Sequence, residues 1–404
     1  MIILFSNKEK YLQKISEIYE TINKLTNENK EIGLLNGMSG ISLFNFYYSH
    51  YVKQEEPCNI ALNIIGHVFD KIAKKNIYHT FCTGLGGVGW TIEHLIQNNF
   101  MDGNTNEILK ESDEYLFGKM LYDIKNNNYD FLHGAIGNGL YFLNRLSNPE
   151  SETYLIQLID ELEKLSIKEK DGSIKWESIV LDANEEPKKV FNLSLSHGMA
   201  SIIAFLAKSY SKNIHKDKAK FLIEGAVKFL LKYKLDTNTY HSNFPSWVCN
   251  NEELSGSRLA WCYGDLGIAV ALYQAAKALQ NNDWEKIALE VLLHSTTRKD
   301  VQKEGVLDAG LCHGSTGIAH IYHRMYLNTG IEQFKDSSGY WFDVTLKIAK
   351  YNDGLAGYKA FRTEKYGGPT KEYGVLEGIA GIGLALISAV SDIEPKWDEC
   401  LLLS

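Results

Sequence analysis

The feature of this sequence that most constrains its fold is a short glycine motif that occurs seven times. In each copy, a leading glycine is followed three positions later by a second small residue, and an apolar stretch runs on from there. The leading glycines are separated by 47 to 66 residues, which leaves room for two helices and two connections in each repeat. The leading glycines are Gly37, Gly84, Gly134, Gly198, Gly264, Gly314 and Gly378, and the second small residues are Gly40, Gly87, Gly137, Ser201, Gly267, Gly317 and Gly381.

The residues around the motifs predict two kinds of helix. Continuous apolar runs such as 268–279 and 382–390 follow the motifs and are typical of buried helices. Between the motifs, apolar residues recur at helical spacing, as Ile15, Ile18 and Ile22 do, which indicates helices with one buried face. Seven such hairpins predict an all-α fold, an α/α toroid or double seven-helix barrel of fourteen helices. No linker is evident, so we expect a single domain over residues 1–404.

One stretch departs from the repeat pattern. Residues 170–173 (Lys-Asp-Gly-Ser) form a turn signal, and the alternating residues 174–180 follow it. Alternation next to a turn indicates strands that pair with each other. The sequence therefore predicts a small β-hairpin insert near residues 167–195, just before the fourth motif.

Composition and charge exclude several classes of protein. The net charge of -8 argues against a nucleic-acid partner. Six cysteines in 404 residues are too few for a disulfide framework and favour a reducing compartment, with metal or catalytic use of the thiols. No apolar run approaches the ~18 residues of a membrane-spanning helix. These features predict a cytoplasmic protein without a membrane span.

Two of the glycine motifs carry residues that could bind a metal ion. Cys262 lies two positions before Gly264, and Cys312-His313 directly precedes Gly314. Two thiolates and one imidazole leave the fourth position of a tetrahedral zinc ion open, which is typical of catalytic zinc sites. The sequence therefore predicts zinc as the cofactor.

Alignment of the repeats on their leading glycines nominates more candidates than one site needs. The position two before the glycine holds Cys82, Cys262 and Cys312, and the position one before it holds His133, His197 and His313. Each has an ordinary structural explanation, because an unpaired cysteine is often a small buried apolar residue. A histidine before a helix is often a cap. Repeat position alone therefore does not select among the six.

Four motifs resemble those of the lanthionine synthetase C-like (LanC-type) cyclases, which are zinc enzymes built as an α/α toroid. The matching segments are Arg258-x-x-Trp261-Cys262-Tyr263-Gly264, Cys312-His313-Gly314, Ser196-His197-Gly198 and Asp130-x-x-x-Gly134, and the resemblance extends from about Gly37 to Gly381. It implies that Cys262, Cys312 and His313 hold zinc. It also implies that His197, Asp130, Arg258 and Tyr263 are catalytic. Cys82 and His133 match no functional position of the family, so we expect them to pack or cap.

The resemblance implies a thiol addition reaction. Peptide cysteine thiolates would add to dehydroalanine or dehydrobutyrine and form (methyl)lanthionine thioether rings. Two anionic sulfur ligands would keep a third thiolate on the zinc electron-rich, which suits it to act as a nucleophile. We expect His197 to donate the proton that completes the addition and Asp130 to orient it or share the proton. Arg258 or Tyr263 would stabilise the developing negative charge.

The same resemblance implies the partners. The substrate would be a dehydrated precursor peptide with a leader. A dehydratase and an exporter would form a complex with the chain. The chain would then be cytoplasmic and could associate with the membrane through these partner proteins. Two alternatives keep the zinc: addition of glutathione to dehydrated residues, and a non-catalytic, zinc-stabilised peptide-binding scaffold. A prenyltransferase-like toroid fits less well, because zinc sites of that kind typically include a carboxylate ligand.

Overall fold

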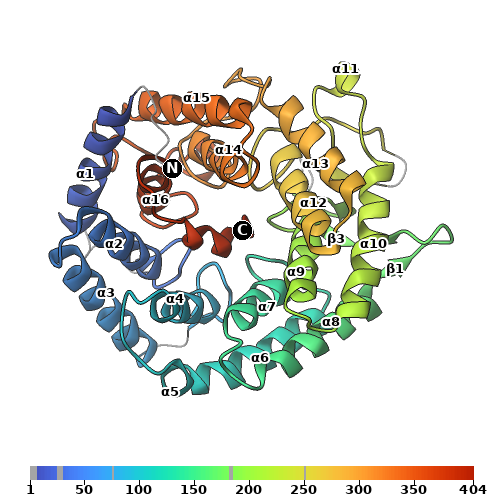
Figure 1. Cartoon of the computed structure of the whole chain (residues 1–404), viewed down its shortest axis with the longest axis horizontal. Helices are drawn as coiled ribbons and strands as arrows, with labels where there is room; N and C mark the ends of the chain where they lie inside the picture. The colour runs from blue at the N-terminus through green and yellow to red at the C-terminus, as the bar shows by residue number, and fades with distance from the viewer. Residues whose placement is uncertain (1–6, 25–30, 75–76, 182–184, 250–251) are drawn as a thin grey trace. The chain divides into compact units, whose positions relative to one another are not determined.

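The computed structural model of the chain is predominantly helical and describes residues 7–24, 31–74, 77–181, 185–249 and 252–404 (Figure 1). Seven helices begin directly after the seven leading glycines: α2 (Met38–Val52), α4 (Leu85–Gln97), α7 (Ala135–Asn144), α9 (Met199–Ser211), α12 (Asp265–Leu279), α14 (Ser315–Thr329) and α16 (Ile379–Val390). Seven more alternate with them: α1 (Lys8–Lys24), α3 (Glu56–Ile72), α6 (Lys110–Lys125), α8 (Ser151–Leu165), α10 (Lys216–Lys232), α13 (Asn282–Ser295) and α15 (Glu332–Ile348). The predicted all-α fold and its fourteen main helices are confirmed in the described part of the chain.

Short elements complete the description. They are the four-residue helices α5 (Thr105–Ile108) and α11 (Thr237–Tyr240) and the 3-10 helices η1 (Glu364–Tyr366) and η2 (Lys396–Leu401). The first three lie in connections between the main helices, and η2 follows α16, the last of them.

The two series of helices differ in burial as their sequences predict. All twelve residues of α16 are buried, in keeping with its continuous apolar run. In α1, Tyr11, Ile15, Ile18 and Ile22 are buried and the opposite face is polar. Apolar residues spaced three and four apart fall on one side of a helix, so this face alone packs against the core.

The chain forms two compact units. One comprises Met1–Ser112 and Gly305–Cys400, and the other comprises Asp113–Glu304 and Leu401–Ser404. In the first, α2 packs against α3, α4 and α16, and α14 packs against α15 and α16. In the second, α9 packs against α7, α10 and α12. In the same unit, α8 packs against α7, and α13 packs against α12. The single domain expected over residues 1–404 stays a prediction.

The loops that carry the glycine motifs are joined by backbone hydrogen bonds at one recurring position. In the first unit, Leu35 N donates to Cys82 O over 3.1 Å, Leu376 N donates to Leu35 O over 2.8 Å, and Cys312 N donates to Leu376 O over 2.9 Å. All four residues lie two positions before a leading glycine. The backbone of this position is therefore held by hydrogen bonds to neighbouring loops. The Cα atom of a residue at this position is fixed as a result, which restricts where its side chain can lie.

The second small residue of the motif is required by close packing at Gly267. A Cβ atom there would collide with the Trp261 carbonyl oxygen and lie 2.7 Å from Leu195 Cβ. We expect Gly267→Ala to lower the free energy of unfolding by about 1–3 kcal/mol, because the backbone must shift to accept it. Gly66, inside α3, has no atom within 4 Å of an added Cβ. Gly66→Ala should therefore raise stability by up to about 1 kcal/mol, and equal urea midpoints for both variants would contradict this explanation.

The β insert is larger than the single predicted hairpin. β1 (Ile167–Lys168) and β2 (Ile174–Lys175) form an antiparallel pair around the predicted turn. A second antiparallel sheet has the order β3 (Ser178–Leu181), β4 (Pro187–Asn192) and β5 (Trp247–Val248). Phe191 pairs with Val248 and Asn192 with Trp247, so the last strand comes from a segment far along the chain. Residues 182–184, which fall inside the predicted insert, lie outside the described residues.

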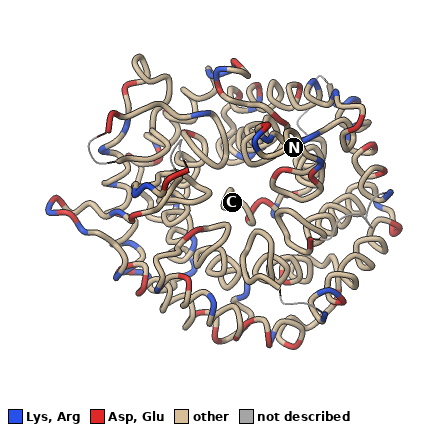
Figure 2. The backbone as a smooth tube through the Cα atoms, turned by 180° about the vertical axis from the view of Figure 1, so that it is seen from behind, with Lys and Arg blue, Asp and Glu red and all other residues tan. Residues whose placement is uncertain are grey.

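Charged residues of both signs are interspersed along the helices (Figure 2). In the described part of the chain, no helix combines the length and apolar character needed to cross a lipid bilayer.

Candidate functional site

The loops that carry the fourth and fifth motifs are joined by hydrogen bonds. Leu195 N donates to the carbonyl oxygen of Cys262 over 3.1 Å, and Ser196 N donates to the same oxygen over 3.4 Å. The hydroxyl of Ser196 also donates to it, over 3.3 Å. His197 follows this contact directly, and Tyr263 follows Cys262. The loop contact therefore brings three predicted site residues into one neighbourhood.

Asp130 and His197 form a dyad. Asp130 Oδ2 lies 2.5 Å from His197 Nδ1, and Asp130 Oδ1 accepts the backbone N–H of His133 over 2.7 Å. Both carboxylate oxygens are thus engaged, which fixes the orientation of the imidazole. Burial alone would lower the pKa of His197, but the hydrogen bond and negative charge of Asp130 outweigh it and raise the pKa above its ordinary value.

Tyr263 lies near His197. The two ring centroids are 6.1 Å apart, and the Trp247 ring meets the Tyr263 ring edge-on at 6.3 Å. Asn192 Nδ2 donates to the Tyr263 hydroxyl over 3.4 Å. Burial is the main cause of a raised pKa for this phenol, so Tyr263 is a neutral hydrogen-bond donor at ordinary pH.

These residues border a cleft of about 1100 Å³ within the second unit. Asp130, His197 and Tyr263 line it together with β3 and Trp247. Two apolar side chains of β3 are unusually open to solvent, with Ile179 67% and Leu181 65% exposed. The cleft is larger than most small-molecule pockets, which suits a substrate of several residues.

The backbone at the start of α12, directly after Cys262 and Tyr263, differs from that at the other six motif helices. Gly264 has φ +97°, whereas the other six leading glycines have extended backbone. A side chain is strained in this conformation, and a Cβ atom would also collide with the Arg258 carbonyl oxygen. Next to it, the buried Asp265 accepts the backbone N–H groups of Asn243 and Phe244 at 2.9 and 3.0 Å. The side chain of Arg258 is half-buried in the same loop.

The sixth motif carries Cys312 and His313 together with a residue that the sequence analysis missed. His313 Nε2 lies 3.0 Å from Oδ2 of the buried Asp308. Burial would raise the pKa of Asp308, but the His313 contact and two backbone N–H donors bring it below its ordinary value. On the other side of the ring, Glu377 Oε1 lies 3.9 Å from His313 Nδ1, and Arg362 pairs with Glu377 at 2.5 Å.

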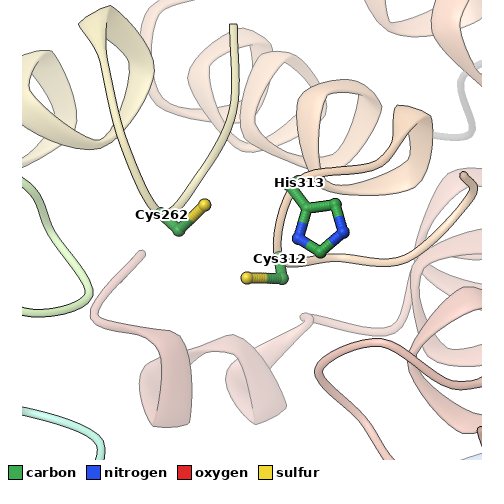
Figure 3. A group of neighbouring side chains, drawn as sticks. All are labelled: Cys262, Cys312 and His313. Carbon is green, nitrogen blue, oxygen red and sulfur yellow. The ribbon is translucent and has the colours of Figure 1, made fainter. Parts of the chain in front are cut away.

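Cys262, Cys312 and His313 present their ligand atoms to one another. One ligand atom from each lies within 4.8 Å of the other two, and Figure 3 shows both sulfur atoms beside the imidazole. Two sulfur ligands of a tetrahedral zinc ion are about 3.8 Å apart, given Zn–S bonds of about 2.3 Å. The set has only soft sulfur and imidazole donors, which suits zinc better than magnesium or calcium. The residues therefore fit the predicted zinc ion.

The structure brings six of the seven predicted site residues into two described groups. Asp130, His197 and Tyr263 share the cleft, and Cys262, Cys312 and His313 form the ligand cluster. The roles of all seven residues stay predictions. Sequence reasoning missed Asp308, Asn192 and Trp247; the first two lie six residues before a leading glycine, so the repeat alignment contained a signal for them.

Comparison with known proteins covers nearly the whole chain. The profile of the "Lanthionine synthetase C-like protein" family matches residues 28–402. The nisin biosynthesis protein NisC of Lactococcus lactis subsp. lactis is 24% identical over 432 residues, which cover 99% of this chain and 97% of that protein. A solved structure of nisin cyclase matches with a TM-score of 0.78 and 20% identity over 98% of each chain. The structural match shows that the two proteins share a fold, as the motif resemblance implied.

Proposed function

Because the chain belongs to the lanthionine synthetase C-like family, we propose that it is a zinc-dependent lanthipeptide cyclase. Its substrate would be a precursor peptide in which serine or threonine residues are already dehydrated. The product would be a peptide with lanthionine or methyllanthionine thioether rings. The observation that carries the proposal is the cluster of Cys262, Cys312 and His313, a three-ligand sulfur and nitrogen set of the catalytic zinc type.

Cys262, Cys312 and His313 would hold the zinc ion and leave one position for a substrate. Zinc bound there would take up a cysteine side chain of the peptide and keep it deprotonated at neutral pH. Because two of the three protein ligands are thiolates, they would limit the loss of electron density from the substrate sulfur. Sulfur-rich ligation therefore supports thiol addition as the reaction.

The addition forms one carbon–sulfur bond and consumes one proton. The thiolate attacks the β-carbon of the dehydrated residue, the carbon–carbon double bond opens, and the negative charge moves to the α-carbon and its carbonyl oxygen as an enolate. His197 would donate a proton to the α-carbon, because Asp130 favours its protonated form. The neutral hydroxyl of Tyr263 can donate a hydrogen bond to the enolate oxygen, and Arg258 would supply positive charge for the same purpose.

The cleft beside His197 supports a peptide substrate. It offers apolar contacts from β3 and Trp247 next to the dyad of Asp130 and His197. A peptide that arrives dehydrated must first meet a dehydratase, so we propose that the chain acts after such an enzyme in the cytoplasm. A complex with that dehydratase and with an exporter remains the expectation given by the family.

The direct test is to incubate the purified protein with a dehydrated cysteine-containing peptide and count free thiols by alkylation and mass spectrometry. The proposal predicts that thiols disappear without a change in peptide mass, because an intramolecular addition conserves all atoms. Consumption of added glutathione with a matching mass increase would instead identify glutathione addition. Binding of the peptide without any loss of thiols would identify a scaffold.

A further inference from the structure

Asp308 is built into the sixth motif loop by contacts to both of its carboxylate oxygens. Oδ1 accepts the backbone N–H of Gly310 over 3.1 Å. Oδ2 accepts the backbone N–H of Phe361 over 2.8 Å and lies 3.0 Å from His313 Nε2. The side chain is almost completely buried, with 1% of its surface exposed. Because these contacts hold the buried carboxylate in one orientation, its Oδ2 atom stays next to the imidazole of His313.

The fourth repeat supplies an internal comparison. Asn192 occupies the equivalent position, six residues before Gly198, and its Oδ1 accepts the backbone N–H of Ser194 over 3.0 Å. This is the same turn that Asp308 Oδ1 makes with Gly310 N. An amide side chain therefore suffices to build the turn, and the negative charge of Asp308 is not needed for it. What distinguishes the sixth repeat is the histidine that Oδ2 meets.

A neutral imidazole has one nitrogen that donates and one that accepts. Because Asp308 Oδ2 cannot donate a hydrogen bond when ionised, the contact with His313 Nε2 requires the proton to be on Nε2. The lone pair of the ring is then on Nδ1, which Figure 3 shows on the side of the ring that faces the two sulfur atoms. A carboxylate behind a metal-binding histidine also raises the basicity of the ligand nitrogen.

We propose that Asp308 is a positioning residue that selects the tautomer of His313 and directs its Nδ1 nitrogen toward the metal. The inference rests on the zinc site of the proposed function and adds to it the residue that orients one ligand. Among the described residues, Glu377 also brings a carboxylate near the ring, but its oxygen is 3.9 Å from Nδ1 and it is paired with Arg362. Asp308 is therefore the carboxylate that sets the ring orientation.

The test is the zinc affinity of the full chain carrying Asp308→Asn, measured by competition with a chromophoric chelator. In this variant, the amide oxygen of Asn can accept the Gly310 N–H as the Asn192 oxygen accepts that of Ser194. The amide NH₂ group then replaces Oδ2 and lies next to Phe361 N and His313 Nε2, which are donors in the unaltered protein. His313 would then favour the tautomer with its lone pair on Nε2, away from the sulfur atoms. We expect zinc affinity to fall roughly 10- to 100-fold, with the helical circular dichroism retained.

The control is Asp398→Asn in the same unit. Asp398 Oδ2 lies 2.8 Å from Nε2 of His320, another buried histidine, which is not part of the ligand cluster. This variant should lose stability yet keep the zinc affinity of the folded protein. A comparable loss of affinity in both variants would show that Asp308 acts only through stability and would overturn the inference.

A second readout reports the tautomer itself. In the zinc-loaded protein labelled with ¹⁵N-histidine, the His313 resonances should show a proton on Nε2 and metal on Nδ1. Metal on Nε2, or wild-type affinity in Asp308→Asn, would overturn the inference and leave the zinc site standing. Failure of the unaltered protein to bind zinc would instead refute the metal site of the proposed function.

Discussion

Replacement of Cys312 by alanine is expected to remove zinc and cyclase activity together. Cys312 supplies one of the two sulfur ligands, and its backbone is fixed by the hydrogen bond to Leu376 O, so another side chain cannot readily move into its place. Two remaining ligands hold zinc weakly in competition with water and buffer. We expect the zinc content to fall from about one ion per chain to near zero and ring formation to slow at least about a hundredfold.

Cys82 provides the matched control for this experiment. It occupies the same position of the second motif, two residues before Gly84, and its carbonyl oxygen accepts the backbone N–H of Leu35. It is buried but is not part of the ligand cluster. Cys82→Ala should therefore lose some stability and keep both zinc and activity. The assignment of the ligands is wrong if Cys82→Ala loses zinc while Cys312→Ala retains it, as metal analysis of the two purified proteins would reveal.

The second large effect is expected from His197→Ala, which should keep its zinc and lose ring closure. His197 is not among the ligand residues, but it faces the cleft and is oriented by Asp130. Loss of a positioned general acid slows a reaction by about 10²- to 10⁴-fold. The measurement is the rate of thiol loss from a dehydrated peptide, taken alongside the zinc content of the same sample.

His133 serves as the control for the histidine. Its ring stacks on that of His197 with a centroid separation of 6.5 Å, and it occupies the same position of the preceding motif. The contact to Asp130 is made by its backbone N–H and survives a change of side chain. His133→Ala should thus keep its rate within a few-fold. Equal losses in both variants would mean that His197 acts through the packing of the cleft and not as a proton donor.

The fold could be predicted from the sequence because one local structure is repeated. Each leading glycine precedes the first residue of a buried helix, and each spacing accommodates one more helix before the next motif. A pattern that recurs seven times identifies helix starts more securely than the propensity of any one segment. The β insert was underestimated because β5 lies more than fifty residues after β4, and no local pattern links a two-residue strand to its partner.

The candidate site could be proposed from the sequence where the motif itself carries residues that can bind a metal ion. Cys262, Cys312 and His313 were selected by their resemblance to the family, and the structure places their ligand atoms together. The contact of Asp130 with His197 joins positions 67 residues apart, so spacing alone could not specify it. Asp308 was missed because its role depends on a buried hydrogen bond, although its place in the repeat is shared with Asn192.

Zinc binding and its role in thiol addition are tested most directly by zinc X-ray absorption of the purified full chain, recorded before and after addition of a dehydrated cysteine-containing peptide. The proposed function predicts one zinc ion with two sulfur ligands, one nitrogen ligand and a further light atom, and a rise to three sulfur ligands when the peptide is present. A sulfur count that stays at two with saturating peptide would contradict it, since the substrate thiol would then react without reaching the metal.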